Sequence, residues 1–239
     1  MNTTTSPRGR AARALLALAL TGAAHAGAAQ ADDPLEAYNR SMTRFNDAVD
    51  EAVLKPVATA YQQALPAPVR TGVSNFFGNL GDAWSFVNNS LQLRGEAAMA
   101  SFFRVSFNTL LGFGGVLDVA SDLGIERHKQ DFGLTLGRWG VPTGPYFVLP
   151  ILGPSTVRDT LALPLDWRGY PLQQVSPTAT RNGLYVLRAV DTRANLLRAE
   201  SVLDEAALDK YSFTRDVYLQ LRRAPAAQGD GTLPPEPEQ

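Results

Sequence analysis

The sequence begins with the pattern of an export signal, yet it contains no cysteine. Arg8 and Arg10 precede an apolar run over residues 11–20, and small residues follow at 24–26 and 29–31. We expect a cleaved signal peptide over residues 1–31, with cleavage after Ala31 preferred over cleavage after Ala26. An exported chain without cysteine forms no disulfides, so its stability must come from packed apolar surface.

The same lack of cysteine leads us to expect no lipoprotein cysteine and no lipid anchor behind the export signal. The apolar run is too short for a helix that spans a bilayer, which takes about 20 residues. No later segment reaches 18 consecutive apolar residues. We therefore expect a chain that lies in a membrane at most, rather than crossing it by a simple helix.

The charge balance excludes one class of partner. The formal net charge is −1 for the whole chain and falls to −4 once the three arginines of residues 1–31 are removed. A mildly acidic protein has no general attraction for phosphate backbones, so we predict no nucleic-acid binding.

Helical periodicity dominates the mature sequence and predicts an all-α fold. Asp33, Pro34 and Glu36 predict a helix start, and Lys55-Pro56 predicts its end. Gly78, Gly81 and a capping Asp82 predict a break between two further helices. The other expected helices are 57–65, 95–111, a region from about 177 to 202, and 209–223. We expect the helical domain to span 32–223 and a disordered tail to span 224–239.

Two segments depart from the usual amphipathic pattern. The helix over 95–111 is apolar around much of its circumference, because Phe102 and Phe103 are adjacent and Val105 and Phe107 lie on different faces. Residues 112–153 are rich in glycine and proline, which predicts turns and helix breaks. Within them Pro150 argues against a central strand over 146–152.

The residues of common catalytic and metal sites are missing. His128 is the single histidine outside the export signal and lies in a charged stretch typical of surface. No zinc, phosphate-loop or nucleophile-elbow motif occurs. We therefore predict that the chain is not an enzyme and holds no metal and no cofactor.

Several blocks in a fixed order resemble the MlaA (VacJ) family of Gram-negative bacteria. They are DPLEAYNR at 33–40, Asn75-Phe76 with Asn79-Leu80, RVSFNTLLG at 104–112, GGVLDVA at 114–120, FGLTLG at 132–137, GVPTGPY at 140–146, Leu149-Pro150, DTRA at 191–194 and 211–219. The resemblance covers roughly residues 33–222.

This resemblance implies a flat ring of amphipathic helices in the periplasmic leaflet of the outer membrane, around a central channel. Members remove mislocalised phospholipids from the outer leaflet and pass them to a periplasmic carrier, MlaC, and they associate with trimeric porins. Many members are lipoproteins. For a chain without cysteine we expect the apolar helices and a porin to hold the protein at the membrane.

The resemblance also suggests site residues. The stretch 137–146 is similar to the loop that gates the channel, with Gly137, Gly140 and Gly144 as flexible points beside Pro142, Pro145 and Tyr146. The same glycines would also suit tight turns in a compact fold.

Residues of the first helix match positions that set the state of the channel in the family: Asn39, Phe45 and Asn46. Because Tyr38 and Phe45 share a face, core packing is the other interpretation. Trp84, Trp139 and Trp167 are candidates for aromatic side chains at a membrane interface, although tryptophan is equally usual in soluble cores.

A different function class fits the sequence as well. The chain could be a soluble periplasmic or secreted helical scaffold or virulence factor that moves no lipid. Cell fractionation distinguishes the two functions, because a soluble scaffold would be recovered without detergent.

Overall fold

The computed structural model describes residues 33–206 and 209–227, so the predicted signal peptide lies outside the described residues. The helices and strands described here all lie in the second of two units, which begins at Leu35. The elements of the second unit are α2 (Glu36–Val49), a π-helical turn (Asp50–Leu54), α3 (Lys55–Ala64), α4 (Ala67–Leu91), α5 (Gly95–Leu110), α6 (Val119–Asp122), α7 (Phe132–Arg138), β1 (Tyr146–Leu149), β2 (Gly153–Thr156), α8 (Val157–Gly169), a 3-10 turn (Pro171–Gln174), α9 (Thr178–Ala206) and α10 (Lys210–Ala227).

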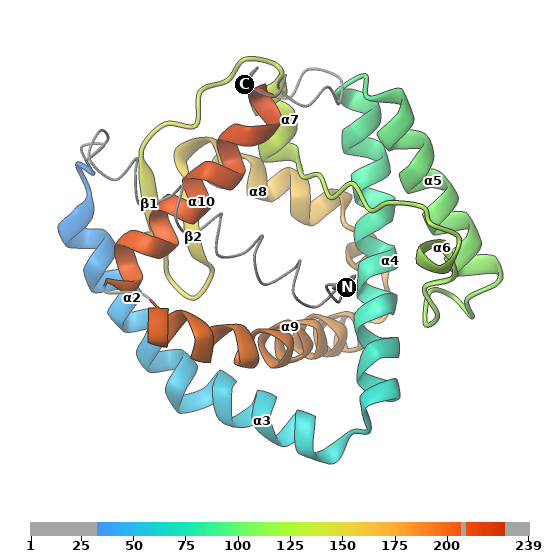
Figure 1. The fold of residues 1–239 in the computed structure, drawn as a ribbon, viewed down its shortest axis with the longest axis horizontal. Coiled ribbons are helices and arrows are strands. Elements are labelled where there is room, and N and C mark those ends of the chain that lie inside the picture. The colour runs from blue at the N-terminus through green and yellow to red at the C-terminus, as the bar shows by residue number, and fades with distance from the viewer. Residues whose placement is uncertain (1–32, 207–208, 228–239) are drawn as a thin grey trace, which may run out of the picture. The chain divides into compact units, whose positions relative to one another are not determined.

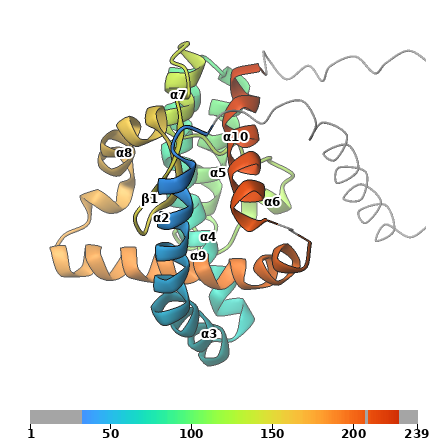
Figure 2. The same ribbon diagram turned by 90° about the vertical axis from the view of Figure 1, so that its left-hand side faces the viewer.

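The helical fold class predicted from the sequence is confirmed. Within this unit α3, α4, α9 and α10 lie around one central region, and α5 and α6 lie outside α4 (Figure 1). Seen from the side, α8 and α10 lie on opposite sides of α2 (Figure 2). None of the described helices combines the length and apolar character that crossing a bilayer requires.

The first helix does not end at Lys55-Pro56 as predicted. Leu35, rather than Asp33, is the N-cap of α2, and the chain stays helical through the π-helical turn into α3. Pro56 lies in the first turn of α3, where a missing backbone N–H costs little.

The predicted break at Gly78 and Gly81 is wrong, because α4 is one helix of 25 residues. A glycine inside a helix costs only about 1 kcal/mol relative to alanine, which tertiary contacts outweigh. A Cβ on Gly78 would lie 3.0 Å from a guanidinium nitrogen of Arg127, so this glycine admits a close approach. Asp82 caps nothing here and is buried in an ion-pair network.

A β-hairpin stands where we predicted only turns. β1 pairs antiparallel with β2, with Tyr146 opposite Thr156 and Leu149 opposite Gly153. Pro150 does not interrupt the hairpin because β1 ends at Leu149 and Pro150 belongs to the turn. The four-residue strands are too short to show a clear alternation of apolar and polar residues in the sequence.

The two C-terminal helices follow the predicted periodicity. α9 covers the region predicted from about 177, and α10 extends to Ala227, four residues past the predicted end at Arg223. Residues 228–239 of the predicted tail lie outside the described residues.

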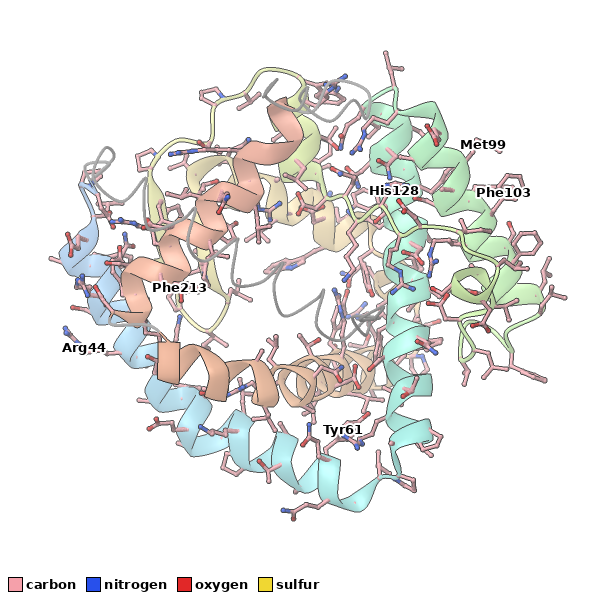
Figure 3. The ribbon with its side chains drawn as sticks, in the orientation of Figure 1. Arg44, Tyr61, Met99, Phe103, His128 and Phe213 are labelled. Atoms are coloured by element: carbon pink, nitrogen blue, oxygen red, sulfur yellow. The ribbon has the colours of Figure 1, made fainter. Side chains whose placement is uncertain are left out.

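Burial in the described residues is inverted relative to an ordinary soluble domain. Buried polar and charged side chains outnumber buried apolar ones, and the largest fully buried side chain is Arg104. On α5 the buried residues are Ala97, Ala98, Ser101, Arg104 and Asn108. Met99 and Phe103 point outward from the same helix (Figure 3). An exposed surface this rich in large apolar groups indicates an apolar environment.

Candidate functional site

A cavity of about 820 Å³ lies among α4, α8, α9, α10, the hairpin and the segment before α7. Its wall is mixed in chemistry. Aromatic and aliphatic groups include Phe77, Trp84, Leu163, Trp167, Tyr185 and Leu196; charged groups include Asp82, Arg127, Lys129, Asp131, Arg188 and Arg222. Such a wall suits an amphiphile, which needs polar partners for one end and apolar contact for the other.

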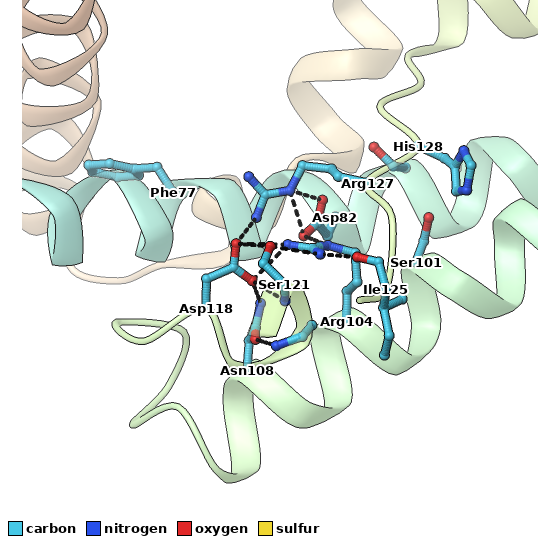
Figure 4. A network of polar contacts seen from close by, with 12 residues as sticks. Phe77, Asp82, Ser101, Arg104, Asn108, Asp118, Ser121, Ile125, Arg127 and His128 are labelled. Carbon is cyan, nitrogen blue, oxygen red and sulfur yellow. Dashed lines mark hydrogen bonds and ion pairs between the residues drawn. The ribbon is translucent and has the colours of Figure 1, made fainter. Parts of the chain in front are cut away.

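A buried ion network supports the α4 side of this wall (Figure 4). Arg104 of α5, 1 % exposed at its side chain, donates to Asp82 of α4 at 3.0 Å and to Asp118 at 2.7 Å. Arg127 donates to Asp82 as well, at 3.1 Å. Arg104 also donates to the carbonyl oxygen of Ile125 at 2.5 Å. The network therefore fixes α4, α5 and the segment before α7 to one another.

The two carboxylates of this network have opposite pKa shifts. Burial raises the pKa of Asp82 above its usual value, although both arginines oppose the change. For Asp118 burial acts in the same direction, but hydrogen bonds from Ser121, Asn108 and Arg104 outweigh it and lower the pKa to about 2. Asp118 is thus a firmly ionised partner for Arg104.

A second ion network supports the part of the wall formed by α7, α8 and α10. Arg222 of α10 pairs with Asp131, the N-cap of α7, and with Asp159 of α8 at 3.2 Å. Tyr218 donates its hydroxyl hydrogen bond to Asp159 at 2.9 Å, and burial raises the pKa of this phenol to about 12. Arg158, buried beside Asp159, adds a further ion pair at 3.1 Å. These contacts join α7, α8 and α10 at the cavity.

Two further carboxylates of the wall accept hydrogen bonds from neutral donors. Asp191 of α9 accepts from the hydroxyl of Ser74 at 2.9 Å and from Tyr61 at 3.1 Å. Asp166 of α8 accepts from the indole of Trp84 at 2.7 Å and from the backbone N–H of Phe132 at 2.8 Å. Burial raises the pKa of Asp166, with these bonds opposing it.

The predicted gating loop divides into packed and open positions. Gly137 lies in α7, where a Cβ would be 2.5 Å from the Arg158 guanidinium. Gly140 and Gly144 have φ of +92° and +69°, which favour glycine, and a Cβ at Gly140 would meet nothing within 4 Å. Pro142 and Pro145 are exposed, and Tyr146 begins β1 and is buried.

Asn39 and Asn46 of α2 both bind the hairpin. The Asn39 amide donates to the carbonyl oxygen of Tyr146 and accepts from the N–H of Val148. Two turns later the Asn46 amide donates to the Leu149 carbonyl at 2.9 Å and accepts from the Ile151 N–H at 2.7 Å. These bonds explain why two amides are spaced seven residues apart on one helix face.

Phe45 is 49 % exposed and Tyr38 is exposed too, so the core-packing interpretation of this pair does not hold. Trp84 packs beside Phe77 and Tyr170, and Trp139 donates to the carbonyl oxygen of Leu91 at 3.1 Å while half exposed. Trp167 is 55 % exposed and lines the cavity. The interface role of the three tryptophans stays a prediction.

His128 is not among the described residues that line the cavity, and its carbonyl oxygen accepts from Asn89 at 3.1 Å. No group of His, Asp or Glu side chains within residues 33–206 and 209–227 gathers closely enough to hold a metal ion.

Sequence reasoning missed the polar interior. Ser85 and Asn89 follow Asp82 at helical spacing on α4, and Ser101, Arg104 and Asn108 recur at helical spacing on α5. This periodic polar face was the available signal. A helical period identifies a face but does not tell whether that face points inward or outward.

Comparison with known proteins identifies the relatives of the chain. A family model described as MlaA lipoprotein matches residues 31–225. A protein of Escherichia coli (strain K12) named "Intermembrane phospholipid transport system lipoprotein MlaA" is 37 % identical over 207 residues, covering 84 % of this chain and 82 % of that protein. A Haemophilus influenzae protein of the same name is 34 % identical over 223 residues, covering 86 % and 85 %.

A solved structure is similar as well. Its description is "Structural basis for maintenance of bacterial outer membrane lipid asymmetry", its TM-score is 0.71 and its sequence identity is 37 %. The match covers 82 % of this chain and 99 % of that one.

These findings correct the predicted localisation. We expected an outer-membrane protein without a lipoprotein cysteine, held by apolar helices and a porin in place of a lipid anchor. The relatives are named lipoproteins, which contradicts the expectation that a lipid anchor plays no part. An outer-membrane location is consistent with the relatives.

Proposed function

This chain belongs to the MlaA family, and we propose that it transports phospholipids between membranes and thereby maintains the lipid asymmetry of the outer membrane. In this proposal the protein lies in the periplasmic leaflet, withdraws mislocalised phospholipids from the outer leaflet through its cavity, and passes them to a periplasmic carrier.

One observation carries the proposal: the described residues expose large apolar side chains outward and enclose a cavity with a mixed wall. The outward apolar groups suit acyl chains of a leaflet, where exposure of phenylalanine and leucine carries no hydration cost. The cavity offers a phospholipid headgroup polar contacts that the surrounding hydrocarbon lacks.

The charges in the wall and directly behind it are paired, so that the cavity keeps its form in a leaflet. Arg104, Arg127 and Arg222 each pair with at least one carboxylate. A buried charge without a partner would be expensive in an apolar surrounding, whereas a paired and hydrogen-bonded one is tolerated. Rigid ion networks on two sides of the cavity thus hold α4, α8 and α10 in place.

The proposed partners follow from this placement. We infer a trimeric outer-membrane porin beside the exposed apolar helices and an MlaC-like carrier at the periplasmic end of the cavity. No covalent step is needed, because differences in lipid affinity between successive binding sites drive net movement.

A cellular assay tests the proposal. Gram-negative cells that lack their own MlaA-family protein receive this chain, and outer-leaflet phosphatidylethanolamine is measured with a membrane-impermeant amine reagent. We expect the chain to lower the labelled lipid. Unchanged labelling, with the protein recovered entirely without detergent, would favour the soluble scaffold instead.

A further inference from the structure

Two cations of the cavity wall differ from the others. Arg127 and Arg222 are matched by carboxylates. Arg188 of α9 and Lys129 have no ion pair and no side-chain hydrogen bond to any residue in the described part of the chain, although both line the cavity. An unmatched cation in such a wall is available to a ligand anion.

Arg188 is held in position without losing its donors. Its guanidinium carbon lies 4.1 Å from the ring centroid of Tyr170. Tyr170 is buried and donates its hydroxyl hydrogen bond to the carbonyl oxygen of Phe77 at 3.1 Å. A cation–π contact uses the face of the guanidinium and leaves its N–H groups at the edge free for an acceptor.

The acids of the same wall do not occupy those donors. Asp191, one turn after Arg188, accepts from Ser74, Tyr61 and Asn195. Asp166 accepts from the indole of Trp84 and from a backbone N–H. Both carboxylates therefore accept hydrogen bonds from other partners, and the N–H groups of Arg188 stay available to a ligand.

An apolar groove of about 490 Å³ lies next to the cavity. Its described lining holds no polar side chain and consists of Pro68, Val69, Gly72, Val73, Phe76, Phe77, Val116 and Leu187. Phe77 lines both the groove and the cavity, and Leu187 of the groove directly precedes Arg188 of the cavity. A cation site and an apolar site thus meet at neighbouring residues.

Building on the proposed function, we propose that Arg188 binds the phosphate of a phospholipid in the cavity while an acyl chain of the same lipid lies across Phe77 in the apolar groove. Two adjoining surfaces of opposite character match the two ends of one amphiphile. A free phosphate would use Arg188 alone and gain nothing from the groove.

Competition binding tests the phosphate contact. The purified full chain in detergent binds fluorescent phosphatidylglycerol, and the competitors are dioleoylphosphatidylglycerol, dioleoylglycerol and inorganic phosphate. We expect Arg188→Gln to weaken phosphatidylglycerol binding about tenfold, the effect of losing one charged hydrogen bond, and to leave dioleoylglycerol unchanged. Arg188→Lys keeps part of the affinity. Arg181→Gln, on the same helix but not among the cavity residues, serves as the control.

A second variant tests the groove. Val69 and Val116 are both exposed groove residues, so Val69→Gln/Val116→Gln adds polarity without disturbing a core. We expect the wild type to prefer dioleoyl- over dihexanoylphosphatidylglycerol and the double variant to lose most of that preference. Val186→Gln, exposed on α9 outside the groove lining, is the matched control.

The outcomes separate the two proposals. Equal phosphatidylglycerol binding by Arg188→Gln and wild type overturns the Arg188 contact, even if the chain restores asymmetry in cells. Inorganic phosphate competing as well as the lipid shows a free-phosphate site and overturns the lipid assignment, as does an unchanged chain-length preference in the groove variant. Failure of the wild type in the cellular assay overturns the proposed function itself.

Discussion

The side-chain amide of Asn39 accepts a hydrogen bond from the backbone N–H of Val148 at 2.8 Å, across 109 positions of sequence. The same amide donates to the carbonyl oxygen of Tyr146 at 3.2 Å. Asn39 is fully buried, so its amide, rather than water, satisfies the hydrogen bonds of the hairpin backbone at this point. The first helix and the strand that follows the predicted gating loop therefore form one unit.

This contact predicts a measurable loss of stability. Asn39→Ala leaves the buried Val148 N–H without an acceptor, which costs about 1–3 kcal/mol in the free energy of unfolding. Asn46→Ala should cost less, because its partner Ile151 is exposed and water replaces the amide. Chemical denaturation of the two variants measures both values. Equal losses would show that burial of the hairpin backbone is not the cause.

We expect deletion of Phe45 and Asn46 to open the proposed channel rather than to abolish it. Removing two residues turns all later side chains of α2 by roughly 200° about its axis. It also removes the bonds from Asn46 to the hairpin. We expect a leaky, dominant effect: cells with both alleles should expose more outer-leaflet phospholipid than cells with the wild type alone. A recessive loss would contradict this prediction.

Bulky residues in the predicted gating loop should block lipid passage. Gly140→Val and Gly144→Val force a β-branched side chain into positive φ, and Gly137→Val meets the Arg158 guanidinium. Outer-leaflet phospholipid should rise in each case. Gly95→Val, where a Cβ would meet nothing within 4 Å, is the control. If outer-leaflet phospholipid rose only in variants with reduced protein levels, the glycines would serve tight turns of the fold rather than gating.

The pKa of Asp118 predicts how stability depends on pH. A folded value of about 2 lies below the usual 3.8, so ionised Asp118 stabilises the fold above pH 4, and this contribution is lost as the pH falls toward 2. Asp118→Asn keeps the N-cap of α6 but removes the charge.

The variant should therefore be less stable than wild type by about 2 kcal/mol at pH 6, and the gap should narrow at pH 2.5. Urea unfolding at the two pH values measures the gap. A constant difference would assign the loss to packing instead of charge.

Much of the helical structure could be predicted from the local periodicity of apolar residues. α9 and α10 were predictable because apolar residues recur at three and four positions over long segments. α4 was not predictable as one helix, because Gly78 and Gly81 are typical of a helix break. The close approach of Arg127 explains the glycine at 78, whereas a Cβ at Gly81 would meet nothing within 4 Å. The hairpin was missed because its strands have only four residues each, and the amides that bind it, Asn39 and Asn46, lie more than 100 residues away in the sequence.

The cavity was beyond sequence reasoning for a related reason. Its wall joins Ser74 of α4 to Arg222 of α10, with contributions from α8, α9 and the hairpin between them. No local pattern links such residues, and the charged ones resemble solvated surface until their partners are known. The family resemblance implied a channel but could not say which side chains line it.

Covalent plugging of the cavity tests the central claim most directly. The chain has no cysteine, so Leu196→Cys at the exposed cavity wall gives a single reactive thiol. Cells that depend on this variant are treated with a bulky charged thiol reagent, and outer-leaflet phospholipid is measured before and after. We expect outer-leaflet phospholipid to rise when Leu196→Cys is labelled and to stay unchanged when Leu196→Ser is treated in the same way. Complete labelling without any rise would contradict passage of phospholipid through this cavity.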